Sequence, residues 1–183
     1  MADASGRGRI RLMRMRNGSR GVTLIELCVA LGIVALLASM AVPGFRADLR
    51  ASAVRGATFE LLAGLQQVHA SAIVEGKTGV LCLSDAAGNC LGSGGEANAW
   101  AAYLEVKGAV DGRPAPLAAR LLPAGIVLRS TRAALRFWPD TLAATTGTLT
   151  ICDTAGVARP RAIVLSQGGR ARLTTPADSA CRP

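Results

Sequence analysis

A single carboxylate stands at the start of the longest apolar segment of the chain. Glu26 directly precedes the stretch from Leu27 to Phe45, which carries no charged side chain. This stretch is about 19 residues long, near the lower limit for a helix that crosses a bilayer. A charge at the edge of hydrocarbon is costly unless an opposite charge meets it, so we expect a functional role for Glu26. The alternative is that Glu26 lies among lipid headgroups.

A second candidate for chemistry is a pair of arginines near the C-terminus, Arg170 and Arg172. Two residues apart on a strand, they would project from the same side, roughly 6.6 Å apart at about 3.3 Å per residue. Gly169 before them leaves the backbone open to an anion. Such a pair can bind neighbouring phosphates without reading bases. From residue 129 onward, eight arginines face three aspartates. The alternative is an edge strand that carries arginines for solubility.

The other polar residues offer no catalytic constellation. His69 is the only histidine, and we expect it to be solvated or half-buried on a helix rather than a general base. Gly76-Lys77-Thr78 imitates the end of a phosphate-binding loop, but Ser71 occupies the position of the required earlier glycine. The cysteines lack the close paired spacing of zinc sites. We therefore expect no enzyme, no metal site and no cofactor.

The five cysteines fall into two groups. Cys28 lies inside the apolar segment, where we expect a small apolar filler. The other four follow that segment, on the side where oxidation is allowed. Four cysteines allow three pairings, and the sequence does not choose among them rigorously. Nearest-neighbour pairing is favoured, which would join Cys82 to Cys90 and Cys152 to Cys181.

The charge before the apolar segment predicts the orientation of the chain. The net charge is +9, but residues 1–21 hold six arginines and one aspartate, which leaves only +4 for the remainder. By the positive-inside rule, the N-terminus stays cytoplasmic, and the chain crosses the inner membrane once to a periplasmic head. A cleaved signal peptide looks similar, but the nearest small-residue cleavage site, at residues 38–41, is not a clean one.

An amphipathic helix is expected after the apolar segment. Beyond Pro43, apolar side chains recur at steps of four and three, which is the stripe of a 3.6-residue period. Gly76 is expected to end the helix. We therefore expect one helix over residues 22–76, with about 22–45 in the membrane or filament and the rest packed under a sheet. The stripe comprises Val54, Thr58, Leu61, Leu65, Val68 and Ala72.

Past Gly76, short apolar or alternating runs are separated by Gly, Pro, Asp and Asn, which indicates strands. Residues 92–98 are expected to be a loop tip. One long helix followed by short strands predicts an α+β fold, in which residues 77–183 form a β-rich head of one or two antiparallel sheets. The expected strands are Val80–Leu83, Ala101–Val106, Gly125–Arg129, Ala134–Trp138, Thr148–Cys152, Ala162–Leu165 and Ala171–Thr174.

The N-terminal segment resembles the class III signal of type IV pilins and type II secretion pseudopilins. The resemblance rests on the order Arg-Gly-Val-Thr-Leu-Ile-Glu over residues 20–26, before an apolar helix and Pro43. It implies that a prepilin peptidase removes residues 1–21, cutting between Gly21 and Val22, and methylates the new amine of Val22. It also implies that Glu26 pairs with the N-terminal amine of an adjacent subunit and that Pro43 loosens the helix.

Two departures from that pattern concern the first mature residue and the leader. Val22 replaces the usual phenylalanine, which methylation should tolerate. A leader of residues 1–21 is long for the simpler pilins, and we expect Met13 or Met15 to be the true start. The arginines of the leader are then a topology signal or precede the true start, and not a DNA-binding arm.

The head resembles the FimT/GspH family of minor pilins and pseudopilins. The resemblance rests on Leu81-Cys82-Leu83-Ser84 with Cys90 and Trp100, on residues 150–153, and on residues 162–170. Gly-Arg-Ala-Arg at residues 169–172 resembles the DNA-binding motif of FimT-type minor pilins that serve natural transformation, which implies Gly169, Arg170 and Arg172 as a site for double-stranded DNA. The alternative is a structural minor pilin or GspH-type pseudopilin that primes assembly with other subunits and binds no DNA.

Overall fold

The computed structural model describes residues 21–92, 95–105 and 116–181. These residues belong to two units, one that ends at Ala41 and one that begins at Val42. Residues 1–20 of the predicted leader (1–21), the predicted strand end Val106, and Arg182 lie outside the described residues. For residues 40–43, which include Pro43, the backbone is helical and the side chains are not described.

The helix α1 (Leu24–Glu75) has a defined signal at each end. At its start, the backbone N–H of Glu26 donates to the Thr23 hydroxyl at 3.3 Å, so Thr23 is the N-cap. Thr23 and Glu26 have the Thr-x-x-Glu spacing of a capping box. At its end, Gly76 has φ 61°, and the N–H of Lys77 donates to the carbonyl of Ala72 at 3.1 Å. This is a Schellman stop, and the predicted helix end at Gly76 is confirmed.

The first unit exposes nearly all its large apolar side chains. Among the described residues, no single helix is long and apolar enough to cross a membrane, and the segments Leu24–Ser39 and Gly44–Glu75 meet that test only as a bent pair. The predicted span over about 22–45 stays a prediction. The large apolar side chains that are at least half exposed are Val22, Leu24, Ile25, Leu27, Val29, Leu31, Ile33, Val34, Leu36 and Leu37.

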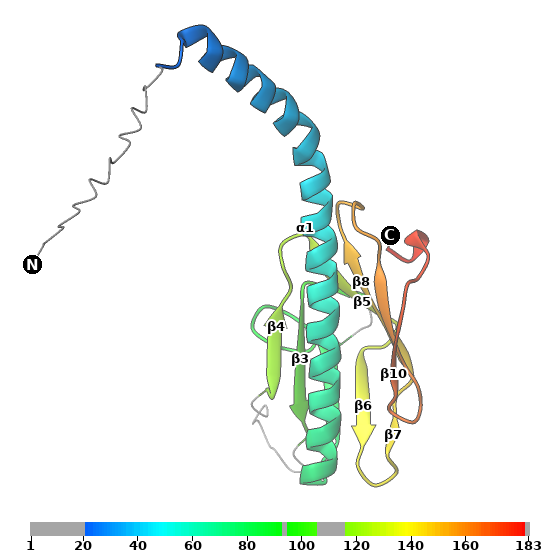
Figure 1. Ribbon diagram of the computed structural model, residues 1–183. Coiled ribbons are helices and arrows are strands. Elements are labelled where there is room, and N and C mark those ends of the chain that lie inside the picture. Colours follow the sequence, from blue (N-terminus) through cyan, green and yellow to red (C-terminus); the bar gives the residue numbers. More distant parts are fainter. Residues whose placement is uncertain (1–20, 93–94, 106–115, 182–183) are drawn as a thin grey trace, which may run out of the picture. The chain divides into compact units, whose positions relative to one another are not determined.

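Within the described residues, ten strands form two five-stranded sheets in which every pairing is antiparallel. The first sheet has the order β4-β3-β1-β6-β7, and the second has the order β10-β9-β8-β5-β2. Figure 1 shows both sheets beside the second half of α1. The strands are β1 (Gly79–Ser84), β2 (Gly95–Ala97), β3 (Ala99–Leu104), β4 (Ala118–Leu121), β5 (Ile126–Ser130), β6 (Ala134–Trp138), β7 (Ala143–Ala144), β8 (Gly147–Asp153), β9 (Arg161–Leu165) and β10 (Ala171–Thr174).

All seven predicted strands are present, and the α+β fold of one helix on antiparallel sheets is confirmed. The prediction of a loop over residues 92–98 is wrong at Gly95–Ala97, which forms β2 and pairs with β5. The error has a physical reason. The segment Gly-Glu-Ala has little strand propensity of its own, and its place depends on the partner strand and on the ion pair of Glu96 with Arg129 at 2.8 Å.

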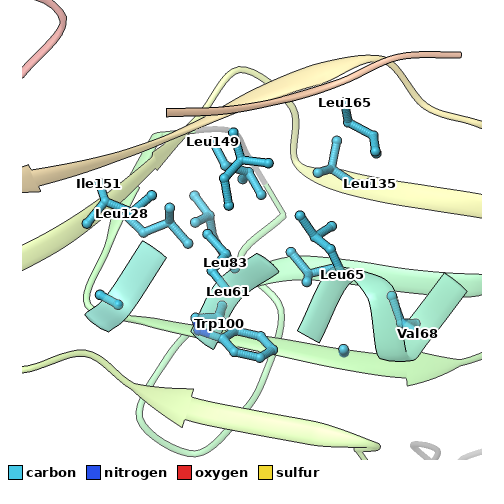
Figure 2. Packing of buried hydrophobic residues seen from close by; sticks show 14 of the residues in the cluster. Leu61, Leu65, Val68, Leu83, Trp100, Leu128, Leu135, Leu149, Ile151 and Leu165 are labelled. Atoms are coloured by element: carbon cyan, nitrogen blue, oxygen red, sulfur yellow. The ribbon is translucent and has the colours of Figure 1, made fainter. Parts of the chain in front are cut away.

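The core lies between α1 and the two sheets. All six members of the predicted helical stripe are buried, and Leu61, Val68 and Ala72 have no exposed surface. Figure 2 shows Leu61, Leu65 and Val68 of α1 among side chains of both sheets, including Trp100 of β3 and Leu149 of β8. The periodicity of the sequence therefore identified the helix face that organises the head.

The four head cysteines form two disulfides. Cys82 of β1 is bonded to Cys90, and Cys152 of β8 is bonded to Cys181 of the short helix η1 (Asp178–Cys181). The favoured nearest-neighbour pairing is confirmed. Cys28, in the first unit, is a free, exposed cysteine.

Candidate nucleic-acid interface

The β9–β10 hairpin carries the arginine pair. Its turn is closed by the N–H of Gly169, which donates to the Ser166 carbonyl at 3.0 Å, and by the N–H of Ser166, which donates to the Arg170 carbonyl at 3.1 Å. Gly169 has φ 72°, a left-handed conformation that closes hairpins of this kind and favours glycine. The requirement for glycine here is therefore conformational, and it places Arg170 directly before β10.

Both arginines lie on the exposed edge of the second sheet. Arg172 pairs in register with Val164 of β9, and β10 is the outermost strand of its sheet. The side chains of Arg170 and Arg172 are exposed, and both line one open depression together with Leu62 of α1. The structure therefore brings the two predicted residues together on one accessible surface.

The charge of this edge is not compensated within the described residues. In the part of the chain that the structure describes, every carboxylate that forms an ion pair does so with another basic side chain. None of them pairs with Arg170 or Arg172. Two guanidinium groups without counter-ions create a local positive potential that attracts anions. The ion pairs join Arg50 to Asp153, Lys77 to Glu75, Arg120 to Glu60, Arg129 to Glu96 and Arg136 to Glu105.

Two further arginines, one just before the hairpin and one at its first residue, are not part of this surface. Arg161 opens β9, whereas Leu165 closes it and pairs with Ala171, next to Arg170. Arg159 and Arg161 therefore lie at the opposite end of the hairpin from the arginine pair. The structure divides the basic C-terminal region into separate sites, which the count of charges along the sequence did not reveal.

His69 is the neighbour that sequence reasoning did not connect with the arginines. Its side chain is half-buried, as expected, and its ring is stacked on Phe137 of β6 with centroids 4.9 Å apart. The ring also lies against Gly169, where an added Cβ would be 2.8 Å from Cε1 of His69. Because α1 and the hairpin are far apart in sequence, spacing alone carried no signal for this contact.

The predicted processing and assembly residues lie at the other end of the chain. Gly21, Val22 and Glu26 are exposed, and an added Cβ at Gly21 would have no neighbour within 4 Å. In the part of the chain that the structure covers, no ion pair involves the Glu26 carboxylate. Within the same part, no group of three or more His, Cys, Asp or Glu side chains could hold a metal ion.

Two protein-family models match the chain, one in the head and one near the N-terminus. The family model described as "Type II transport protein GspH" matches residues 57–169, which is more than half of the chain and ends directly before Arg170. The chain belongs to the GspH family. A second model, the prokaryotic N-terminal methylation motif, matches residues 16–42. This GspH-family protein therefore combines a pilin-type N-terminus with a minor-pilin or pseudopilin head.

The chain is also similar to individual pilins and to a pseudopilin. A type IV major alpha-pilin of Moraxella bovis is 40% identical over 65 residues, which cover 36% of this chain and 40% of the pilin, so the chain spans less than half of that relative's length. The minor pseudopilin EpsH of the Vibrio cholerae type 2 secretion system shares the fold, with 14% identity and a TM-score of 0.51 over 68% of this chain and 98% of EpsH. The minor pilin FimU of Pseudomonas aeruginosa is 20% identical, with a TM-score of 0.48 over 67% of this chain and 97% of FimU.

Proposed function

We propose that this GspH-family protein is a minor pilin of the FimT type, incorporated in a type IV pilus, whose head binds extracellular double-stranded DNA without sequence specificity for uptake in natural transformation. One observation carries the proposal: Arg170 and Arg172 share an exposed sheet edge and, among the described residues, neither has a carboxylate partner. Guanidinium groups bind phosphates through charge-assisted hydrogen bonds. Contacts limited to phosphates would bind DNA of any sequence.

The double substitution Arg170→Ala/Arg172→Ala should weaken DNA binding about tenfold at moderate salt, since each lost phosphate contact removes an ionic interaction. The logarithm of affinity should also depend less steeply on the logarithm of salt concentration, by about 1.8, because each phosphate contact contributes about 0.9 to that slope. The measurement is fluorescence anisotropy of a labelled duplex with the full-length protein in neutral detergent, over a series of salt concentrations.

A matched control removes the same charge from a different place. Arg159→Ala/Arg161→Ala also deletes two arginines, at the opposite end of the hairpin, and should change affinity by less than about twofold. Equal losses in the two double variants would mean that net charge, and not this edge, attracts DNA. An unchanged affinity in Arg170→Ala/Arg172→Ala would reject the site.

We further propose how the N-terminal unit is used. Its exposed apolar side chains need to be covered, and lipid or the helices of neighbouring subunits would cover them. Prepilin peptidase would cut between Gly21 and Val22 while the helix is anchored in the inner membrane, with the N-terminus cytoplasmic. The Glu26 carboxylate would then pair with the Val22 amine of an adjacent subunit, and Pro43 would loosen the helix between membrane part and head.

The mature protein should begin at Val22 with a methylated α-amine. The prediction follows from the exposed Gly21–Val22 junction, directly before the N-cap of α1, and from the methylation motif over residues 16–42. Mass spectrometry of the N-terminal peptide from sheared filaments or membranes measures it. A mature chain that starts at any other residue contradicts the processing proposal and, with it, the pairing of Glu26.

A second candidate function is a purely structural subunit that primes assembly of a pilus or of a type II secretion pseudopilus. The match to "Type II transport protein GspH" favours it. It predicts that the head has no measurable affinity for DNA and that deletion of the gene reduces the number of filaments. The anisotropy experiment above therefore distinguishes the two candidates.

A further inference from the structure

The imidazole of His69 presents its nitrogen-bearing edge to the arginine hairpin. A Cβ built on Gly169 would lie 2.8 Å from Cε1, 3.1 Å from Nε2 and 3.5 Å from Nδ1 of His69. The three nearest ring atoms are thus the two nitrogens and the carbon between them. Within the described residues, no hydrogen bond or ion pair involves this side chain, so no protein group there is a hydrogen-bond partner of the ring nitrogens.

A cavity of about 360 Å³ opens between α1 and the hairpin beside this ring. Its polar side chains are Gln66 and His69 from α1 and Arg170 from the hairpin, and Phe137 of β6 and Leu165 of β9 supply apolar walls. Arg170 is the one charged residue among the described residues that line this cavity with His69, and no carboxylate is among them. An arginine and a histidine therefore line one cavity without a carboxylate.

We propose that this cavity is a phosphate subsite of the DNA interface, in which the imidazolium form of His69 and Arg170 together bind one backbone phosphate. The inference rests on the proposed DNA-binding function and deepens it. Protonated imidazole is a hydrogen-bond donor at both nitrogens and adds a charge. The Gln66 amide can donate to the same phosphate. The stacked ring of Phe137 favours the cation, because an aromatic face attracts positive charge.

The proposal couples DNA binding to proton uptake. A bound phosphate favours a cation beside it. DNA therefore binds the protonated form more tightly, and by linkage the affinity is highest at low pH and falls as pH rises through the range in which histidine loses its proton. Since His69 is the only histidine of the chain, a pH dependence between about pH 5.5 and about pH 8 that a His69 variant loses is the contribution of this side chain.

The experiment measures duplex affinity and its salt slope for the full-length protein in neutral detergent at both ends of this window. The wild-type protein should bind about fivefold more tightly at the acidic end, with a salt slope larger by about 0.9, the contribution of one more phosphate contact. His69→Gln, which keeps a polar side chain that does not titrate, should lose this difference between the two pH values.

A second variant covers the case in which His69→Gln disturbs the hairpin. His69→Lys carries a fixed charge and should bind at the alkaline end about as tightly as the wild type does at the acidic end. An undiminished pH dependence in His69→Gln, or alkaline affinity in His69→Lys no higher than in the wild type, overturns the subsite. Either result leaves the effect of Arg170→Ala/Arg172→Ala intact, so failure of the subsite and failure of the DNA-binding function are distinguishable.

Discussion

Gly64→Ala should lower the free energy of unfolding of the head by about 2–3 kcal/mol. Gly64 lies on α1 directly against the indole of Trp100, and an added Cβ would stand 2.3 Å from Cη2 and 2.6 Å from Cζ3 of that ring. Trp100 is 1% exposed, so the ring has no free space into which it could move. Either α1 or β3 must shift, and the packing shown in Figure 2 loosens around both.

Gly56→Ala is the matched control on the same helix. An added Cβ at Gly56 would meet nothing within 4 Å, and the residue is exposed. Alanine in the middle of an exposed helix is favoured over glycine by about 0.5–1 kcal/mol. The two substitutions are chemically identical, yet their effects on the free energy of unfolding should have opposite signs.

Chemical denaturation of the full-length protein in neutral detergent, followed by tryptophan fluorescence, measures both variants. The double variant Gly64→Ala/Trp100→Phe adds a further check, because a smaller ring leaves room for the new methyl group. It should be less destabilised than the sum of its two single substitutions. A neutral Gly64→Ala would show that α1 and β3 are not in contact at this point.

Removing the disulfide between Cys152 and Cys181 should cost about 3.5 kcal/mol of stability, the largest effect that we expect from any single change. The bond closes a loop with a sequence separation of 29, and a cross-link stabilises mainly by restricting the unfolded chain, more so for longer loops. The bond also holds η1 against β8, where the Arg129 guanidinium donates to the Ala180 carbonyl at 3.5 Å.

The second disulfide supplies the internal comparison. Cys82 and Cys90 have a sequence separation of only 8, so the same reasoning expects a loss of about 2.5 kcal/mol for its removal. Serine substitutions of each pair, compared by denaturant midpoint under oxidising conditions, test the order. A larger loss for the Cys82–Cys90 pair would contradict the loop-length explanation and indicate that native packing around β1 dominates.

Local patterns in the sequence determined much of this fold. The residues of the helical stripe from Val54 to Ala72 recur with the period of the helix, so they lie on one helix face. That face is buried against the sheets. Gly76 ended the helix as predicted because a left-handed residue is needed there. The two nearest-neighbour cysteine pairs could be favoured from the sequence alone, and the structure contains both of them.

Features without a strong local pattern escaped prediction. The strands β2, β4 and β7 are short and consist largely of alanine, glycine and charged residues. Each of them lies at an edge of its sheet. Such segments adopt extended structure because a partner strand supplies the hydrogen bonds and the cross-strand contacts. Their place depends on the sheet and not on their own side chains.

The candidate site also has residues that the sequence predicts and neighbours that only the tertiary structure reveals. Gly169, Arg170 and Arg172 could be named from the sequence, since two arginines two residues apart on a strand share one side. Only the tertiary structure separated them from Arg161 and brought His69 to them. A strand end and a helix face that are distant in sequence become neighbours through sheet register and core packing, and these are properties of the whole fold that local residue spacing does not encode.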